Sequence, residues 1–216
     1  MNANASVNHQ INRSWWGYAV ILLVAAGLRF ALLGVNPLDD QQANLALQAL
    51  SVSRNVGVNL SGEPGYIALT SILFDLFKAS GFWARFWPAL LGTCAVLLPF
   101  LYRKWLGGST ALVLTALIAL DPMMIGASRS AGGTMLALVG VFAALGFWLN
   151  NRPVLSGIFL GVALNGGSAF WPLALITAGV FPIWRKKPAN RDVTSLNRTR
   201  GIHPLVIVLS IAAISS

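Results

Sequence analysis

Charged side chains are scarce in this sequence, and acids are the scarcest of them. Only 10% of the 216 residues are Asp, Glu, Lys or Arg, and six of these are acids. The chain also has only one cysteine and two widely separated histidines, His9 and His203. These numbers exclude a disulfide framework, a cysteine or histidine metal site and a histidine-based catalytic pair. We expect Cys94, which lies inside an apolar run, to pack against neighbouring side chains.

Apolar residues take the place of charge. They make up 56% of the chain, with a mean hydropathy of +0.69, whereas about a quarter of a soluble domain is charged. The apolar runs lack period-two alternation, so helices are expected rather than barrel strands. We therefore predict an all-α fold, a polytopic transmembrane helical bundle with about six to seven spanning helices. The predicted spans are residues 15–35, 86–102, 109–125, 134–149, 153–164 and 172–184, and a further helix starts at 204–216.

The positions of Lys and Arg give the orientation, because these residues mark cytoplasmic loops. Residues 185–203 contain six basic residues and one acid and form the predicted basic cytoplasmic loop. This loop has no aromatic side chains to stack on bases, so membrane lipid is its expected partner and nucleic acid is rejected. We therefore expect residues 1–14 to form a cytoplasmic tail and residues 15–184 to form the transmembrane domain. Nothing indicates a eukaryotic secretory route, and we expect a protein of the bacterial cytoplasmic (inner) membrane.

This orientation places residues 36–82 in a long first outer loop. Two segments of the loop, 41–53 and 65–77, have helical patterns but are too short to span, so interfacial helices are expected. The 65–77 helix is expected at, or dipping into, the outer interface. Arg29, near the outer end of the first helix, is expected to snorkel toward water.

Five of the six acids gather on the outer face: Asp39, Asp40 and Glu63 in the first outer loop, Asp75 in the interfacial helix, and Asp121 near the end of a spanning helix. A positive-inside topology by itself leaves acids outside, and one Asp can cap the following helix. An adjacent pair repels, however, and its repulsion is relieved by a cation or ligand. Both interpretations stay open. No cofactor is assigned, and a divalent cation at the pair is the open alternative.

Several short motifs occur in a fixed order along the first two thirds of the chain. They read GLRFALLGVNPLDD, SGEPGYIALTSILFDLF, ARFWPALLGT, YRKWLG and LDPMMIGASRSAGG. Over residues 25–150 their order resembles the N-terminal half of the GT-C membrane glycosyltransferases, in particular the protein mannosyltransferase and aminoarabinose transferase-like branch. The resemblance implies transfer of a sugar from a polyprenyl phosphate carrier to an acceptor at the outer face.

The resemblance also implies roles for individual residues. The catalytic base would be Asp39 or Asp40, and the alignment does not choose between them. Arg129 and Arg85 are candidates to bind the lipid phosphate, with anchoring of a helix end as the alternative for each.

Two departures from the family pattern weigh against activity. Gly132-Gly133 stands where relatives often carry an acid, which leaves Glu63 and Asp121 as the other candidate substrate-binding acids. The motifs also cover only half of such an enzyme. Two hypotheses therefore stay open: a polyprenyl-phosphate-sugar-dependent glycosyltransferase, and a catalytically inactive accessory subunit that binds other membrane subunits in a larger complex.

Overall fold

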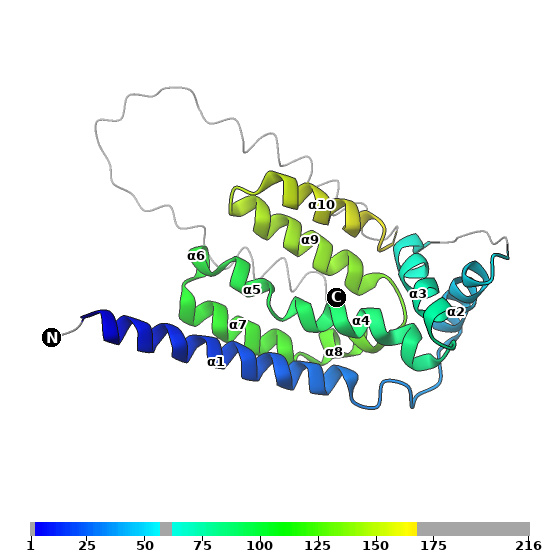
Figure 1. The fold of residues 1–216 in the computed structure, drawn as a ribbon, viewed down its shortest axis with the longest axis horizontal. Coiled ribbons are helices and arrows are strands. Elements are labelled where there is room, and N and C mark those ends of the chain that lie inside the picture. Colours follow the sequence, from blue (N-terminus) through cyan, green and yellow to red (C-terminus); the bar gives the residue numbers. More distant parts are fainter. Residues whose placement is uncertain (1–2, 57–61, 168–216) are drawn as a thin grey trace, which may run out of the picture. The chain divides into compact units, whose positions relative to one another are not determined.

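The protein is all-helical throughout the part that a computed structural model describes, residues 3–56 and 62–167 (Figure 1). The chain divides into two units, Met1–Ala174 and Leu175–Ser216, and every described residue belongs to the first. The helices are α1 (Ala3–Phe30), α2 (Asp40–Ser53), α3 (Pro64–Leu76), α4 (Gly81–Ala95), α5 (Leu98–Leu101), α6 (Arg103–Leu106), α7 (Gly108–Leu120), α8 (Pro122–Arg129), α9 (Thr134–Leu149) and α10 (Pro153–Leu164). The predicted all-α class is confirmed.

The helices differ in their ability to cross a membrane. Gly81–Leu101, which joins α4 and α5, is long and apolar enough to span, and α7 with α8 qualifies as a second span if their 56° bend is counted as one broken helix. The apolar part of α1 (Trp16–Phe30), α3, α9 and α10 are shorter. The predicted count of six to seven spans is therefore not confirmed.

Several predicted boundaries agree with the structure and others do not. α9 and α10 begin and end at the predicted residues, 134–149 and 153–164. α1 begins at Ala3 and ends at Phe30, so the helix predicted at 15–35 starts too late and ends too late. Turns follow it, and Leu32 adopts a positive φ of 56° that a helix does not allow.

Small residues set the closest helix contacts. α9 packs along α10, where a Cβ on Gly140 would lie 2.8 Å from the Cβ of Ala163. α1 packs against α4 and α7, with Ala25, Val96 and Ala119 fully buried between them. α2 and α3 pack on each other and on the N-terminal end of α4. The segment between α1 and α2 is thereby brought to that end of α4.

The predicted span at 172–184, the basic loop at 185–203 and the helix start at 204–216 lie outside the described residues.

Candidate active site

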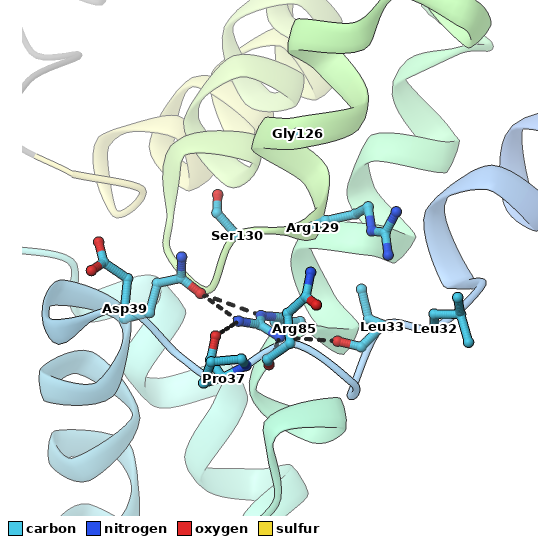
Figure 2. Close-up of a pocket in the computed structure, with 10 residues that line it drawn as sticks. Leu32, Leu33, Pro37, Asp39, Arg85, Gly126, Arg129 and Ser130 are labelled. Atoms are coloured by element: carbon cyan, nitrogen blue, oxygen red, sulfur yellow. Dashed lines mark hydrogen bonds between the residues drawn. The ribbon is translucent and has the colours of Figure 1, made fainter.

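A pocket lies where the segment between α1 and α2 meets α4 and α8. Its volume is about 250 Å³, near the lower limit of small-molecule sites. Three residues predicted from the sequence line it, namely Asp39, Arg85 and Arg129 (Figure 2). The remaining lining residues are Leu32, Leu33, Asn36, Pro37, Gln42, Gly126 and Ser130. One acid and two arginines from three segments of the chain thus line one cavity.

The helix start distinguishes the two adjacent acids. Asp39 occupies the N-cap position of α2, but its side chain accepts no capping hydrogen bond. Asp40 is the first residue of α2, is exposed and does not line the pocket. Among the described residues, neither carboxylate has a side-chain hydrogen bond or ion pair. Asp39 is therefore an exposed lining residue of the pocket, and its carboxylate has no structural partner in the described part of the chain.

Arg129 ends α8 and is half-buried. One Nη2 hydrogen donates to the backbone oxygen of Ala31 at 2.9 Å, which ties the end of α8 to the turns after α1. No acid lies within ion-pair distance among the residues that the structure describes. The other guanidinium hydrogens therefore remain available to an anion in the pocket.

Arg85 is bound very differently, although it lines the same pocket. It is only 5% exposed, and its Nε, Nη1 and Nη2 atoms make five hydrogen bonds of 2.8–3.3 Å. The acceptors are the backbone oxygens of Leu33, Asn36 and Pro37 and, twice, the side-chain oxygen of Gln42. A guanidinium has five N–H donors, so every donor is used within the protein. Arg85 therefore ties the first turns of α4 to the segment between α1 and α2.

The two remaining candidate acids bind backbone and do not line the pocket. The Glu63 Oε2 atom accepts a hydrogen bond from the Gly133 N–H at 2.7 Å, in front of the first residue of α9. Asp121 is the N-cap of α8, and its Oδ1 atom accepts from the Met123 N–H at 3.0 Å. Both carboxylates satisfy free N–H groups near a helix start, which is an ordinary structural use of an acid.

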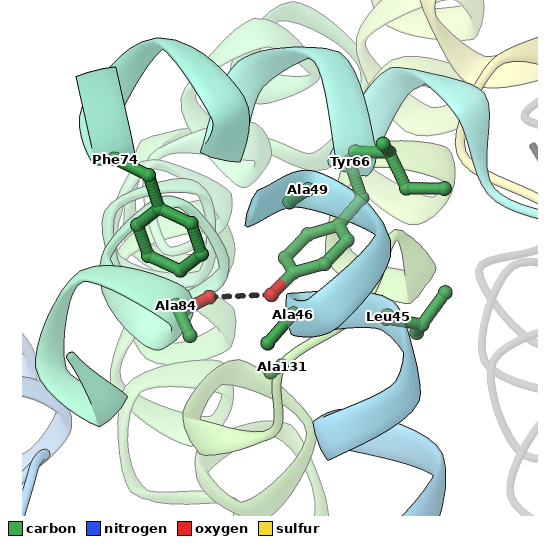
Figure 3. Packing of buried hydrophobic residues seen from close by; sticks show 8 residues of the cluster. Leu45, Ala46, Ala49, Tyr66, Phe74, Ala84 and Ala131 are labelled. Carbon is green, nitrogen blue, oxygen red and sulfur yellow. Dashed lines mark hydrogen bonds between the residues drawn. The ribbon is translucent and has the colours of Figure 1, made fainter. Parts of the chain in front are cut away.

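A buried tyrosine of the GEPGY motif joins α2 and α3 to α4. Tyr66 is 2% exposed and packs with Leu45, Ala46, Ala49 and Phe74 (Figure 3). Its hydroxyl donates to the backbone oxygen of Ala84 at 2.8 Å. Burial raises the pKa of Tyr66 to about 12. α2 and α3 are thereby fixed to α4.

Comparison with known families decides the chain's membership. Residues 49–215, more than half of the chain, match the family model described as dolichyl-phosphate-mannose-protein mannosyltransferase. The chain belongs to this family. The match confirms the family predicted from the motifs. No curated protein and no solved structure gives a significant match.

Membership makes the chain a membrane glycosyltransferase-like protein of a family that uses lipid-linked sugar donors. Arg85 and Arg129 lie inside the matched range, whereas Asp39 and Asp40 precede it. The assignment of a role to Asp39 or Asp40 therefore depends on the geometry of the site, and not on the extent of the family match.

Sequence reasoning missed one buried charge near this site. Arg29 is fully buried in the last turn of α1 and does not snorkel. Its guanidinium donates to the backbone oxygens of Ala25, Ile118 and Ala119 at 3.2–3.3 Å, while its Nε atom has no partner. Ile118 and Ala119 belong to the last turn of α7, where helix carbonyls lack intrahelical partners. Arg29 therefore caps α7 at its bend into α8.

Proposed function

We propose that the protein is a glycosyltransferase that moves a sugar from a polyprenyl phosphate carrier to an acceptor hydroxyl at the outer membrane face. The single observation that carries this proposal is that Asp39 and Arg129 line one pocket, where, among the described residues, the Asp39 carboxylate has no partner and the Arg129 guanidinium has one. A base and an anion-binding group are the two parts that this transfer requires from the protein.

Each part has one chemical task. The acceptor oxygen attacks the anomeric carbon, and the bond from that carbon to the phosphate oxygen breaks. Its electron pair leaves with the polyprenyl phosphate, whose developing charge Arg129 stabilises. The acceptor proton passes to the Asp39 carboxylate, which acts as a general base. Asp39 is preferred to Asp40 for this task because Asp39 lines the cavity.

Aromatic residues support an outer, interfacial position for the pocket. Phe82, Trp83, Phe86 and Trp87 form a continuous set of ring contacts on the first turns of α4, and Phe77 stacks on Trp83. Such clusters favour the headgroup level of a membrane. The exposed Arg103 and Lys104 lie after the other end of the Gly81–Leu101 span and favour the cytoplasmic side.

The proposed topology agrees with this orientation of the Gly81–Leu101 span. The N-terminus lies in the cytoplasm of a bacterial cell, six to seven helices cross the inner membrane, and the pocket lies at the level of the donor's phosphate. This position suits a donor whose tail stays in the bilayer while its sugar is in water.

A non-catalytic accessory subunit is the second candidate. It is favoured by the two other outer acids, Glu63 and Asp121, whose carboxylates are used on backbone N–H groups. Among the residues that the structure describes, the pocket then has a single acid, Asp39, and no second carboxylate to bind a metal or an acceptor.

The two functions are separated by an assay on the full chain in lipid nanodiscs. Tritiated polyprenyl-phosphate mannose serves as the donor probe, and solubilised native membranes supply acceptors. We expect Asp39→Asn to lower transfer by about 10²- to 10⁴-fold without loss of donor binding. The matched Asp40→Asn variant should stay within about threefold of the unmodified chain.

Equal effects of the two Asn variants would contradict the assignment of Asp39 as the base. An unmodified chain that neither binds nor transfers this donor, but copurifies with stoichiometric subunits, would establish the accessory function instead.

A further inference from the structure

The segment that carries Asp39 has little support of its own. Residues 31–39 lie between α1 and α2, and their backbone forms isolated turn bonds such as Val35 N–H to Leu32 O at 3.2 Å. Leu32 holds a left-handed φ of 56°, a conformation that a leucine keeps only when its surroundings impose it. Contacts from elsewhere in the chain must therefore fix this segment.

Arg85 provides these contacts from α4. Its Nη1 atom donates to the backbone oxygens of Leu33 and Asn36 at 3.1 and 2.8 Å, and its Nη2 atom donates to that of Pro37 at 2.8 Å. Its Nε and Nη2 atoms donate to the Gln42 side-chain oxygen at 3.3 and 3.1 Å. Arg85 thus binds the chain on both sides of Asp39, at Pro37 two residues before it and at Gln42 three residues after it.

We infer that Arg85 is a positioning residue that holds the Asn36–Gln42 backbone and thereby keeps Asp39 in place at the pocket. Figure 2 shows the Arg85 guanidinium directed toward Pro37, Leu33 and the segment that leads to Asp39, with Arg129 on another element. All five of its donors are used on the protein, so Arg85 has none left to bind a phosphate without breaking this set. The inference rests on the proposed function for its effect on transfer.

A lysine cannot perform the same task. The guanidinium presents five donors in a rigid planar fork, whereas an ammonium has three donors at one point. Lys at position 85 keeps the positive charge but cannot reach the four acceptors together. Arg85→Lys therefore separates the positioning role from a purely electrostatic one.

The test compares Arg85→Lys and Arg85→Gln with Arg103→Gln, an exposed arginine of α6 that serves as the control. Amide hydrogen exchange on the full chain in nanodiscs reports segment 32–45, with α9 as the internal reference. Exchange in segment 32–45 should rise at least about tenfold in both Arg85 variants and stay unchanged in α9 and in Arg103→Gln.

The same variants are assayed with tritiated polyprenyl-phosphate mannose. We expect kcat to fall by about 100-fold, as a misplaced base predicts, while the KM for the donor stays within about threefold. If the Arg85 variants do not fold, Gln42→Leu removes the acceptor of two of the five bonds and should give a smaller change of the same kind.

Unchanged exchange in segment 32–45 would overturn the inference. A raised donor KM with normal kcat and normal exchange would also overturn it, because Arg85 would then bind the phosphate. If the unmodified chain transfers nothing, the proposed function fails, and the exchange data alone decide whether Arg85 holds the segment.

Discussion

The Tyr66 hydroxyl donates its hydrogen bond to the one carbonyl that Pro88 leaves without a helical partner, that of Ala84. In a regular helix the Ala84 oxygen accepts from the N–H four residues later, and Pro88 has no N–H. Ala84 is fully buried, so water does not replace the missing donor. The GEPGY motif of α3 is thereby joined to the first turn of α4.

Loss of the Tyr66 hydroxyl should therefore destabilise the protein measurably. We expect Tyr66→Phe to lower the free energy of unfolding by about 1–3 kcal/mol, because it leaves a buried carbonyl unsatisfied. Denaturant unfolding of the full chain in detergent, followed by tryptophan fluorescence, measures the change.

A second variant tests the cause. Pro88→Ala restores an N–H four residues after Ala84, so Tyr66→Phe should cost less in this background. The double-mutant cycle should give a coupling of at least about 1 kcal/mol. Additive effects would show that the hydroxyl acts in some way other than by satisfying the Ala84 carbonyl.

The same tyrosine predicts alkaline sensitivity. Burial raises its pKa from 10.0 to about 12, so the folded protein holds the phenol proton more tightly than the unfolded chain. The contribution of this proton to the free energy of unfolding is complete below pH 10 and is lost as the pH rises through 12. The total loss is about 2–3 kcal/mol. Unfolding measured between pH 9 and 12 should show this loss, and Tyr66→Phe should remove that part of it. An equal pH dependence in both proteins would contradict the assignment.

The sequence predicted the parts of the site that depend on residue type, and missed those that depend on backbone partners. Asp39 and Arg129 were found from charge and motif, and the structure places both at one pocket. The choice between Asp39 and Asp40 required the first residue of α2. Arg29 and Arg85 are buried against backbone carbonyls, and a carbonyl belongs to every residue, so no sequence pattern reveals such a partner.

Helix boundaries divide in the same way. α9 and α10 were predicted to the residue because turn residues delimit each apolar run. The bend at Asp121 was missed. The span predicted at 109–125 runs through it, whereas Asp121 and Pro122 start a new helix, α8, which ends at Arg129.

Glu63 should prove structural and not catalytic. Glu63→Gln keeps an acceptor oxygen for the Gly133 N–H, so we expect transfer to stay within about threefold, with a small fall in Tm. Gly133→Ala should destabilise the protein more, since its Cβ would lie 2.2 Å from the Gly166 backbone oxygen. We expect the free energy of unfolding to fall by about 1–3 kcal/mol. Gly27→Ala, with no atom within 4 Å of the added Cβ in the described structure, is the matched control. A large loss of transfer in a well-folded Glu63→Gln protein would place Glu63 in the chemistry.

Arg129 should determine donor affinity, in contrast to Arg85. Its guanidinium has one hydrogen bond to the protein, at Ala31, and no acid partner among the described residues, so its charge is free to meet a phosphate. Arg129→Gln should raise the KM and the Kd for polyprenyl-phosphate mannose by about 10- to 100-fold, the worth of a charge-assisted hydrogen bond. Arg129→Lys keeps the charge without the planar fork and should recover part of the loss. Because the contact to the leaving phosphate strengthens as its charge develops, kcat should fall as well.

Binding to nanodiscs that carry the tritiated donor, measured with and without added sodium chloride, separates the effect of the Arg129 charge from that of its planar geometry. Only the Gln variant should lose the salt dependence of donor binding. Donor affinity equal to that of the unmodified chain in Arg129→Gln would remove Arg129 from the phosphate site and leave the tie to Ala31 as its role.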